Sequence, residues 1–140
     1  MVIGISDYKY DTRRDPAKGI PDLRFADEDA RAFARFLTSP AGGAFRPDHA
    51  LLLTDRKATI KEVRKGIGDF LARSLEDDLV IIFYAGHGIP DPKNPENLYL
   101  ACYDTEPGNY YGTGGELGFW GRPERKRGKF PAYLRQMGRE

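Results

Sequence analysis

The chain has 140 residues, of which 40% are hydrophobic, and this is the size and apolar content of a single domain rather than of a disordered protein. Its longest apolar run spans residues 79–85, far short of the about 20 residues that cross a bilayer, so the sequence excludes a membrane-spanning helix. The net charge of +1 indicates no polyanionic partner, and a single cysteine, Cys102, excludes an internal disulfide framework and a multi-thiolate zinc site.

The first half of the chain predicts strands that alternate with helices. The apolar run 2–5 is typical of a buried strand, and a polar loop follows it. Apolar residues at steps of three and four then predict a helix over 23–37, with Asp22 as its N-cap. The same patterns predict a second strand at 50–53 and a second helix over 60–71.

The second half predicts two more strands and then loses its periodicity. Residues 79–84 form a continuous apolar run, as in a strand covered on both faces of a parallel sheet, and 98–101 predict a fourth strand. We therefore expect an α/β fold, a three-layer sandwich with a mainly parallel sheet that is incomplete on its C-terminal side. We place the core at 1–113 and a basic, irregular tail at 114–140, where seven Lys or Arg residues outnumber three Asp or Glu.

His87 is the residue that the sequence marks for chemistry. It lies between Gly86 and Gly88 just beyond the strongest predicted strand, where α/β sheets present catalytic groups. Flanking glycines would let the backbone turn sharply and approach a substrate, although an ordinary tight turn is the alternative interpretation. The other histidine, His49, is expected to be a surface loop residue.

A histidine base needs a nucleophile within about 3 Å, or one water away. The hydroxyl and thiol groups predicted near the same sheet edge are those of Ser6, Thr54 and Cys102. Metal binding is less well supported, and we expect no cofactor, because no tight multi-ligand spacing accompanies the three acids near strand ends, which are Asp7, Asp55 and Asp104.

An ordered series of short segments carries a family resemblance: Val2-Ile3-Gly4-Ile5-Ser6-Asp7-Tyr8, Leu23-Arg24-Phe25-Ala26 with Asp29-Ala30, and Phe83-Tyr84-Ala85-Gly86-His87-Gly88. The later Leu98-Tyr99-Leu100 and Tyr103-Asp104 extend the series. Over residues 1–113 the chain resembles the large-subunit half of the caspase-like cysteine peptidases (peptidase C14 type), and is most similar to metacaspases and their bacterial relatives.

The resemblance implies the caspase-like fold and a cysteine endopeptidase that hydrolyses peptide bonds with a Cys-His dyad. It makes His87 the histidine that assists the thiolate and protonates the leaving amine, and it places the backbone N–H of Gly88 in the oxyanion hole. It leaves Asp29 a structural role. Metacaspase-like members cut after Arg or Lys, but part of that specificity pocket lies beyond this chain. Only the family resemblance suggests that the protein requires calcium.

The nucleophile of the resembled family is missing from its expected place. In caspases the cysteine follows the histidine by about 50 residues, yet no cysteine lies near Met137. Cys102 is expected to be a semi-buried strand residue and not the nucleophile. Either the chain is a fragment, or its reading frame changes after about Gly114. We favour a truncated or frame-altered gene, and in either case we predict no peptidase activity for this chain alone.

Two other functions stay open. The first is a non-catalytic caspase-like interaction module, which would be a pseudoenzyme or a truncated fragment. An incomplete sheet exposes an edge strand, and such an edge can pair with a second copy of the chain or with a complementing chain that carries the cysteine. The second is nucleic-acid binding, which we do not expect because basic runs are more often solvated tails; it would use Arg122, Arg125, Lys126, Arg127 and Lys129 with Phe119, Trp120 and Phe130. We expect a peptide or protein substrate, no membrane contact and, without a signal peptide, a cytoplasmic location.

Overall fold

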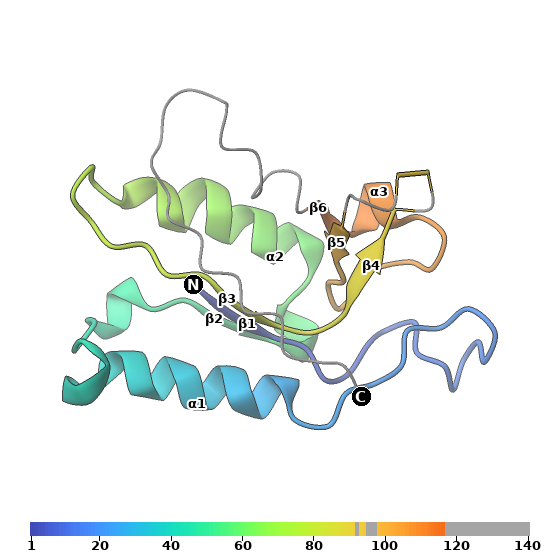
Figure 1. Ribbon diagram of the computed structural model, residues 1–140, viewed down its shortest axis with the longest axis horizontal. Coiled ribbons are helices and arrows are strands. Elements are labelled where there is room, and N and C mark those ends of the chain that lie inside the picture. The colour runs from blue at the N-terminus through green and yellow to red at the C-terminus, as the bar shows by residue number, and fades with distance from the viewer. Residues whose placement is uncertain (92, 95–97, 117–140) are drawn as a thin grey trace.

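A computed structural model describes residues 1–91, 93–94 and 98–116 of the chain (Figure 1). Most of the predicted tail falls outside these ranges, together with the basic run, its aromatic neighbours and Met137. Within the described chain no helix has both the length and the apolar character needed to cross a membrane.

A parallel sheet of three strands lies at the centre of the fold. β1 (Val2–Gly4) runs between β2 (Leu52–Thr54) and β3 (Phe83–Ala85). Apart from Thr54 at the end of β2, their residues are apolar or aromatic and mostly buried, as expected of strands that are covered on both faces.

Two helices supply the crossover connections that parallel strands require. α1 (Ala26–Thr38) connects β1 to β2, and α2 (Ile60–Lys65) lies between β2 and β3. Figure 1 shows α1 on one face of the sheet and α2 on the other. This arrangement confirms the predicted three-layer α/β sandwich. Short 3₁₀ turns interrupt the connections, among them those at Pro40–Gly42, Pro47–His49 and Asp55–Lys57.

Each face of the parallel sheet has its own apolar core. The larger cluster lies on the α2 side, and its fully buried members include Ile3, Ile5 and Tyr8. The smaller cluster packs Ala30 of α1 against Val2. The burial of both faces explains why the strands are continuous apolar runs.

The start of α1 differs from the prediction. The helix begins three residues later, and Asp22 is not its N-cap, because the Asp22 carboxylate accepts a hydrogen bond from the Tyr8 N–H at 3.0 Å. The Ser6 hydroxyl instead accepts from the N–H of Asp27 in the first turn, at 3.1 Å. A side chain at the end of β1 therefore replaces the expected local cap.

The helix predicted over 60–71 has a regular part and an irregular part. Thr59 caps its start, where the hydroxyl accepts from the Glu62 N–H at 3.3 Å. The regular helix then passes into a π-helical turn at Gly66–Phe70 and a 3₁₀ turn at Leu71–Arg73. The two glycines in this region weaken a regular helix, which is consistent with the change of winding.

The strand predicted at 79–84 is shorter in the structure and shifted toward its end. Within the predicted run, pairing with β1 begins only at Phe83, because Phe83 is opposite Val2, the first residue of β1. The Met1 amine donates to the Ile81 carbonyl oxygen at 2.8 Å.

The fourth predicted strand exists but does not join the parallel sheet. β5 (Leu98–Leu100) lies between β4 (Gly88–Pro90) and β6 (Gly115–Glu116) in a separate antiparallel sheet. The connection from β4 to β5 is too short for a parallel crossover, so the fourth predicted strand lies outside the parallel sheet that the first three strands form. α3 (Tyr110–Thr113) precedes β6, whose two residues belong to the predicted tail.

Candidate active site

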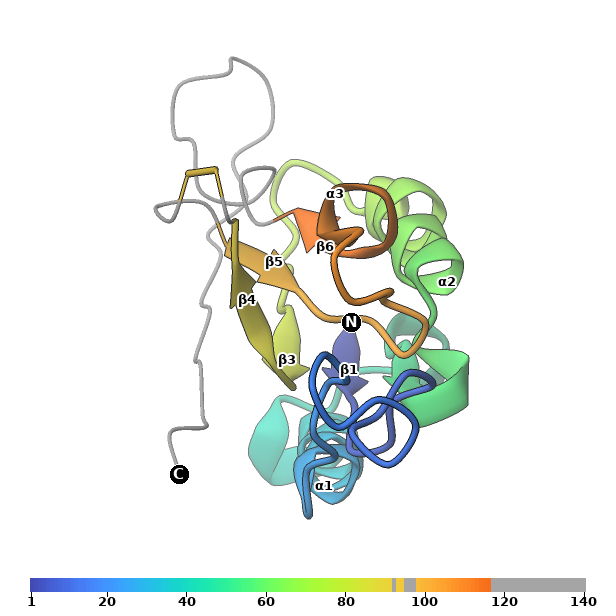
Figure 2. The same ribbon diagram turned by 90° about the vertical axis from the view of Figure 1, so that its right-hand side faces the viewer.

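His87 lies at the junction of the two sheets. It follows β3 at the carboxyl edge of the parallel sheet and directly precedes β4. Its carbonyl oxygen accepts a hydrogen bond from the Ala101 N–H at 2.9 Å, next to the pairing of β4 with β5. Figure 2 views the molecule from this end, with the loop that follows β1 in front of the strands. His87 therefore lies at the strand end where the sequence predicts it.

A backbone carbonyl holds the imidazole ring of His87. The Nε2 atom lies 2.8 Å from the carbonyl oxygen of Pro21, in the loop before α1. Because a carbonyl oxygen can only accept, Nε2 carries a proton, and the neutral ring presents Nδ1 as its basic nitrogen. Sequence reasoning missed Pro21, since a main-chain carbonyl gives no signal in the residue type.

Two buried tyrosines contact the backbone of His87. The Tyr8 hydroxyl accepts from the His87 N–H at 3.0 Å, and the Tyr84 hydroxyl lies 2.9 Å from the His87 carbonyl oxygen. The two tyrosines are 1% and 7% exposed. Burial raises the pKa of both hydroxyls above the ordinary value for tyrosine, so both stay protonated at physiological pH.

Gly86 leaves room for these two hydroxyls. A Cβ atom at this position would lie 2.5 Å from the Tyr84 hydroxyl oxygen and 3.0 Å from that of Tyr8. Neither Gly86 nor Gly88 has a positive φ. The sharp turn expected from the flanking glycines therefore does not use their conformational freedom, and the first glycine is required for close packing instead.

The backbone N–H of Gly88 points away from β5. Gly88 is opposite Leu100 in the antiparallel register, and the neighbouring residue His87 accepts a hydrogen bond from the Ala101 N–H. Because the His87 carbonyl points toward the β5 side, the N–H of Gly88 in the same peptide unit points the other way. Since β4 is an edge strand of the described sheet, this N–H faces the open side, one residue from the imidazole. A donor with this orientation can bind an oxyanion.

The three candidate nucleophiles are engaged or buried. The Ser6 hydroxyl donates to Asp27 Oδ1 at 2.7 Å. Thr54 is 7% exposed and Cys102 only 1%. The Cys102 N–H donates to the Thr105 hydroxyl at 2.8 Å in the turn that follows β5. Cys102 therefore lies two residues beyond β5 and is fully buried, whereas we expected a semi-buried residue within the strand. Its structural role stays a prediction.

Two of the acids considered as metal ligands bind backbone groups instead. Asp55 Oδ1 accepts from the N–H groups of Ser6 and Asp7, at 2.9 and 3.1 Å. Asp104 Oδ1 accepts from the Ile60 N–H at 2.8 Å, at the start of α2. Both carboxylates thereby connect loops at the carboxyl end of the sheet to neighbouring segments.

The remaining sequence candidates lie on the surface. The His49 side chain is 64% exposed, far along the chain from the site. Asp29 is exposed in the first turn of α1, where a carboxylate stabilises the positive end of the helix dipole.

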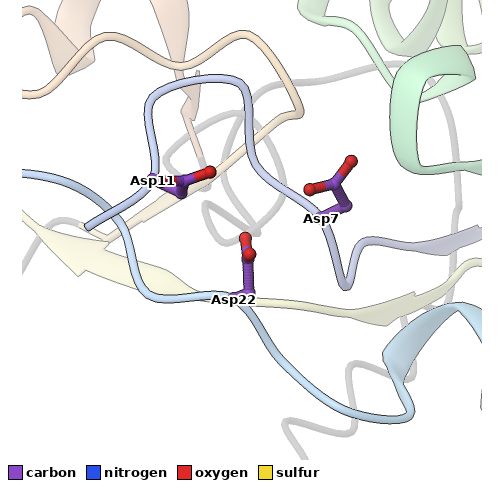
Figure 3. Close-up of side chains that lie close together, drawn as sticks. All are labelled: Asp7, Asp11 and Asp22. Carbon is purple, nitrogen blue, oxygen red and sulfur yellow. The ribbon is translucent and has the colours of Figure 1, made fainter. Parts of the chain in front are cut away.

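Three carboxylates that the sequence did not single out as a group lie together in the loops between β1 and α1 (Figure 3). They belong to Asp7, Asp11 and Asp22, and one oxygen of each lies within 4.8 Å of the others. The Arg13 guanidinium forms ion pairs with all three, at 3.4, 2.6 and 2.7 Å. Its hydrogen bond holds the pKa of the Asp11 carboxyl below the usual value.

Calcium prefers oxygen ligands of this kind. However, the Arg13 cation already pairs with Asp7, Asp11 and Asp22. In this arrangement the three acids do not fit a cation site, and we derive no role for calcium from them.

Comparison with known proteins identifies one family. The family model for the caspase domain, peptidase C14, matches residues 1–111. No curated protein and no solved structure gives a significant match. The matched range contains the whole parallel sheet, both main helices and His87, and it covers well over half of the chain. The chain therefore belongs to the caspase domain family.

Proposed function

We propose that the chain carries the histidine side of a metacaspase-type cysteine endopeptidase site, which hydrolyses peptide bonds in a peptide or protein substrate. The observation that carries the proposal is the His87 imidazole, which the Pro21 carbonyl orients at the carboxyl edge of the sheet. Membership of the caspase domain family supports the reaction class.

In the proposed reaction Nδ1 of His87 takes the proton of a thiol, and the thiolate attacks the carbonyl carbon of the scissile peptide bond. The same nitrogen then protonates the leaving amine. The hydrogen bond from Nε2 to the Pro21 carbonyl persists throughout and stabilises the imidazolium. The Gly88 N–H donates to the oxyanion, an interaction worth about 3 kcal/mol in related acyl-transfer sites.

The thiol in this proposal does not come from Cys102, which is the only cysteine of the chain and is buried. The open edge of β3 is where a strand bearing it would bind. Phe83 and Ala85 hydrogen-bond to β1, so the N–H and C=O of Tyr84 point outward, where no strand lies among the described residues. A strand added in parallel at this edge would end beside His87.

A thiol supplied in solution tests the role of His87 without that strand. The purified chain is mixed with a small thiol and a fluorogenic arginine ester, and ester cleavage is compared with that of His87→Gln and of the surface control His49→Gln. We expect thiol-dependent cleavage by the chain and by His49→Gln, because general-base catalysis requires His87. Equal rates for the chain and for His87→Gln would contradict the proposal.

The open edge also favours a second candidate, a non-catalytic module that pairs with another chain. Exposed edge strands invite such pairing. Ile82→Pro removes a backbone N–H next to β3, whereas Ile82→Ala removes side-chain atoms and keeps the N–H. If pairing occurs there, size-exclusion chromatography finds a dimer for the chain and for Ile82→Ala, and a monomer for Ile82→Pro. A stable monomer for the unmodified chain counts against self-pairing.

A further inference from the structure

We infer that Tyr8 and Tyr84 are positioning residues for His87, because their hydroxyls hold its backbone where the imidazole meets the Pro21 carbonyl. The inference rests on the proposed function for the catalytic role of His87. It concerns groups that lie on the buried side of His87 and that take no part in the proton transfers themselves.

His87 is held at both backbone groups as well as at its ring. Its N–H donates to the Tyr8 hydroxyl at 3.0 Å. Its carbonyl oxygen accepts from the Ala101 N–H and lies 2.9 Å from the Tyr84 hydroxyl, which is also 2.7 Å from the Ala101 carbonyl oxygen. The direction of the Cα–Cβ bond, and with it the reach of the imidazole, is set by these contacts.

The segment that holds the backbone of His87 is also tied to the residue that holds its ring. The Tyr8 N–H donates to Asp22 Oδ1 at 3.0 Å, and Asp22 follows Pro21 directly. The rings of Tyr8 and His87 are in contact as well, with centroids 5.4 Å apart and planes inclined at 43°. Tyr8 therefore fixes the distance between the histidine backbone and the carbonyl that its Nε2 must reach.

The hydroxyl groups separate this role from simple packing. Tyr8 belongs to the larger apolar core, and its ring alone would fill that space. The glycine at Gly86 shows that the fold makes room for the hydroxyls, since a Cβ there would overlap that of Tyr84 at 2.5 Å. Tyr→Phe substitutions keep the ring and remove only the hydroxyl, so they test positioning rather than packing.

The test measures His87 directly in the full chain. The substitution His49→Gln leaves His87 as the single histidine, and its ring is labelled with nitrogen-15. In this background we compare Tyr8→Phe, Tyr84→Phe and the control Tyr10→Phe. Tyr10 is a fitting control because its hydroxyl is exposed and contacts Glu106, at 3.5 Å on the surface.

In Tyr8→Phe we expect the amide proton of His87 to exchange with solvent about tenfold faster, because it loses its acceptor. We also expect the ring nitrogen shifts to change from those of a single tautomer protonated at Nε2 to those of a mixture. Tyr84→Phe changes the ring shifts in the same direction by a smaller amount, because the Ala101 N–H still binds the His87 carbonyl. Tyr10→Phe changes neither quantity.

Unchanged ring shifts and unchanged amide exchange in Tyr8→Phe would overturn the inference. If circular dichroism shows that Tyr8→Phe is unfolded, the ring nitrogen shifts of Tyr84→Phe test the inference in its place. Unchanged shifts in Tyr84→Phe would then overturn the inference. Neither measurement needs a substrate or a thiol. The nuclear magnetic resonance measurement can therefore contradict the positioning role while the ester assay supports the proposed function. The opposite result is equally possible, so failure of the inference and failure of the proposed function are distinguishable.

Discussion

The two ends of the parallel sheet are held together in different ways. At the carboxyl end, side chains bind the backbone of distant segments, as Asp55 binds the start of the loop after β1 and Tyr8 binds His87. At the amino end, a cavity of about 290 Å³ beside Met1 is lined by apolar side chains that include Leu37 and Phe45, and by polar ones that include Asp48 and Ser74.

The difference reflects what each end does. Hydrogen bonds are directional and fix the positions of individual atoms, whereas apolar contacts stabilise a region without orienting a particular group. The proposed chemistry needs an oriented imidazole, and the oriented contacts lie at the end that carries it. At the other end the residues Leu75 and Leu79 are 76% and 61% exposed.

Removal of the Asp55 carboxylate is expected to disturb the carboxyl end most. Asp55→Ala leaves the N–H groups of Ser6 and Asp7 without their acceptor and puts alanine at a φ of +45°, so we expect a loss of about 3 kcal/mol in unfolding free energy. Asp55→Asn keeps an oxygen acceptor and tolerates this backbone, with a loss of about 1 kcal/mol. Urea unfolding measures both, and equal losses would contradict the role given to the acceptor.

A pair of glycine substitutions tests whether the tyrosine hydroxyls are fixed. Gly86→Ala is expected to destabilise the chain by about 2 kcal/mol, because the buried Tyr84 ring has no space to move away. At Gly68 an added Cβ has no neighbour within 4 Å, and in this helical region Gly68→Ala should stabilise by about 0.5–1 kcal/mol. Thermal unfolding compares them. If both substitutions stabilised the chain, the tyrosine hydroxyls near Gly86 would not be fixed in position.

The amino end is predicted to respond to pH. Burial lowers the pKa of the Met1 amine from 8.0 to about 6, while the amine donates to Ile81. Between these values the unfolded chain binds more protons than the folded chain, so stability rises with pH. We expect the gain from pH 6 to pH 8 to be about 1 to 2 kcal/mol. Acetylation of the Met1 amine should remove most of this rise in unfolding free energy with pH. A rise of the same size after acetylation would show that another group causes it.

Local patterns predicted the elements well, and contacts between distant segments account for the differences. The periodicity that marks α1 and the apolar run before His87 are properties of neighbouring residues. The N-cap at Asp22 was wrong because a group far along the chain, the Tyr8 N–H, binds that carboxylate. The antiparallel pairing of β5 depends on the length of its connection to β4. A cytoplasmic location and a calcium requirement stay predictions.

The candidate site was predictable only in part. His87 follows a recognisable strand and lies within a family motif, so its position could be inferred. Pro21 acts through its carbonyl and Tyr8 through a contact across 79 residues of sequence, and neither has a local signature. Arg13 likewise joins three acids that are separate in the sequence.

The central proposal is that this caspase domain holds an oriented histidine and that the nucleophile is not one of its own residues. The most direct measurement is turnover of fluorogenic peptides with Arg, Lys or Asp before the scissile bond. The purified chain is assayed with and without calcium, beside Cys102→Ala and His87→Ala. We predict no turnover by a chain that circular dichroism shows to be folded. Turnover that is lost in both variants would contradict the account and make Cys102 the nucleophile.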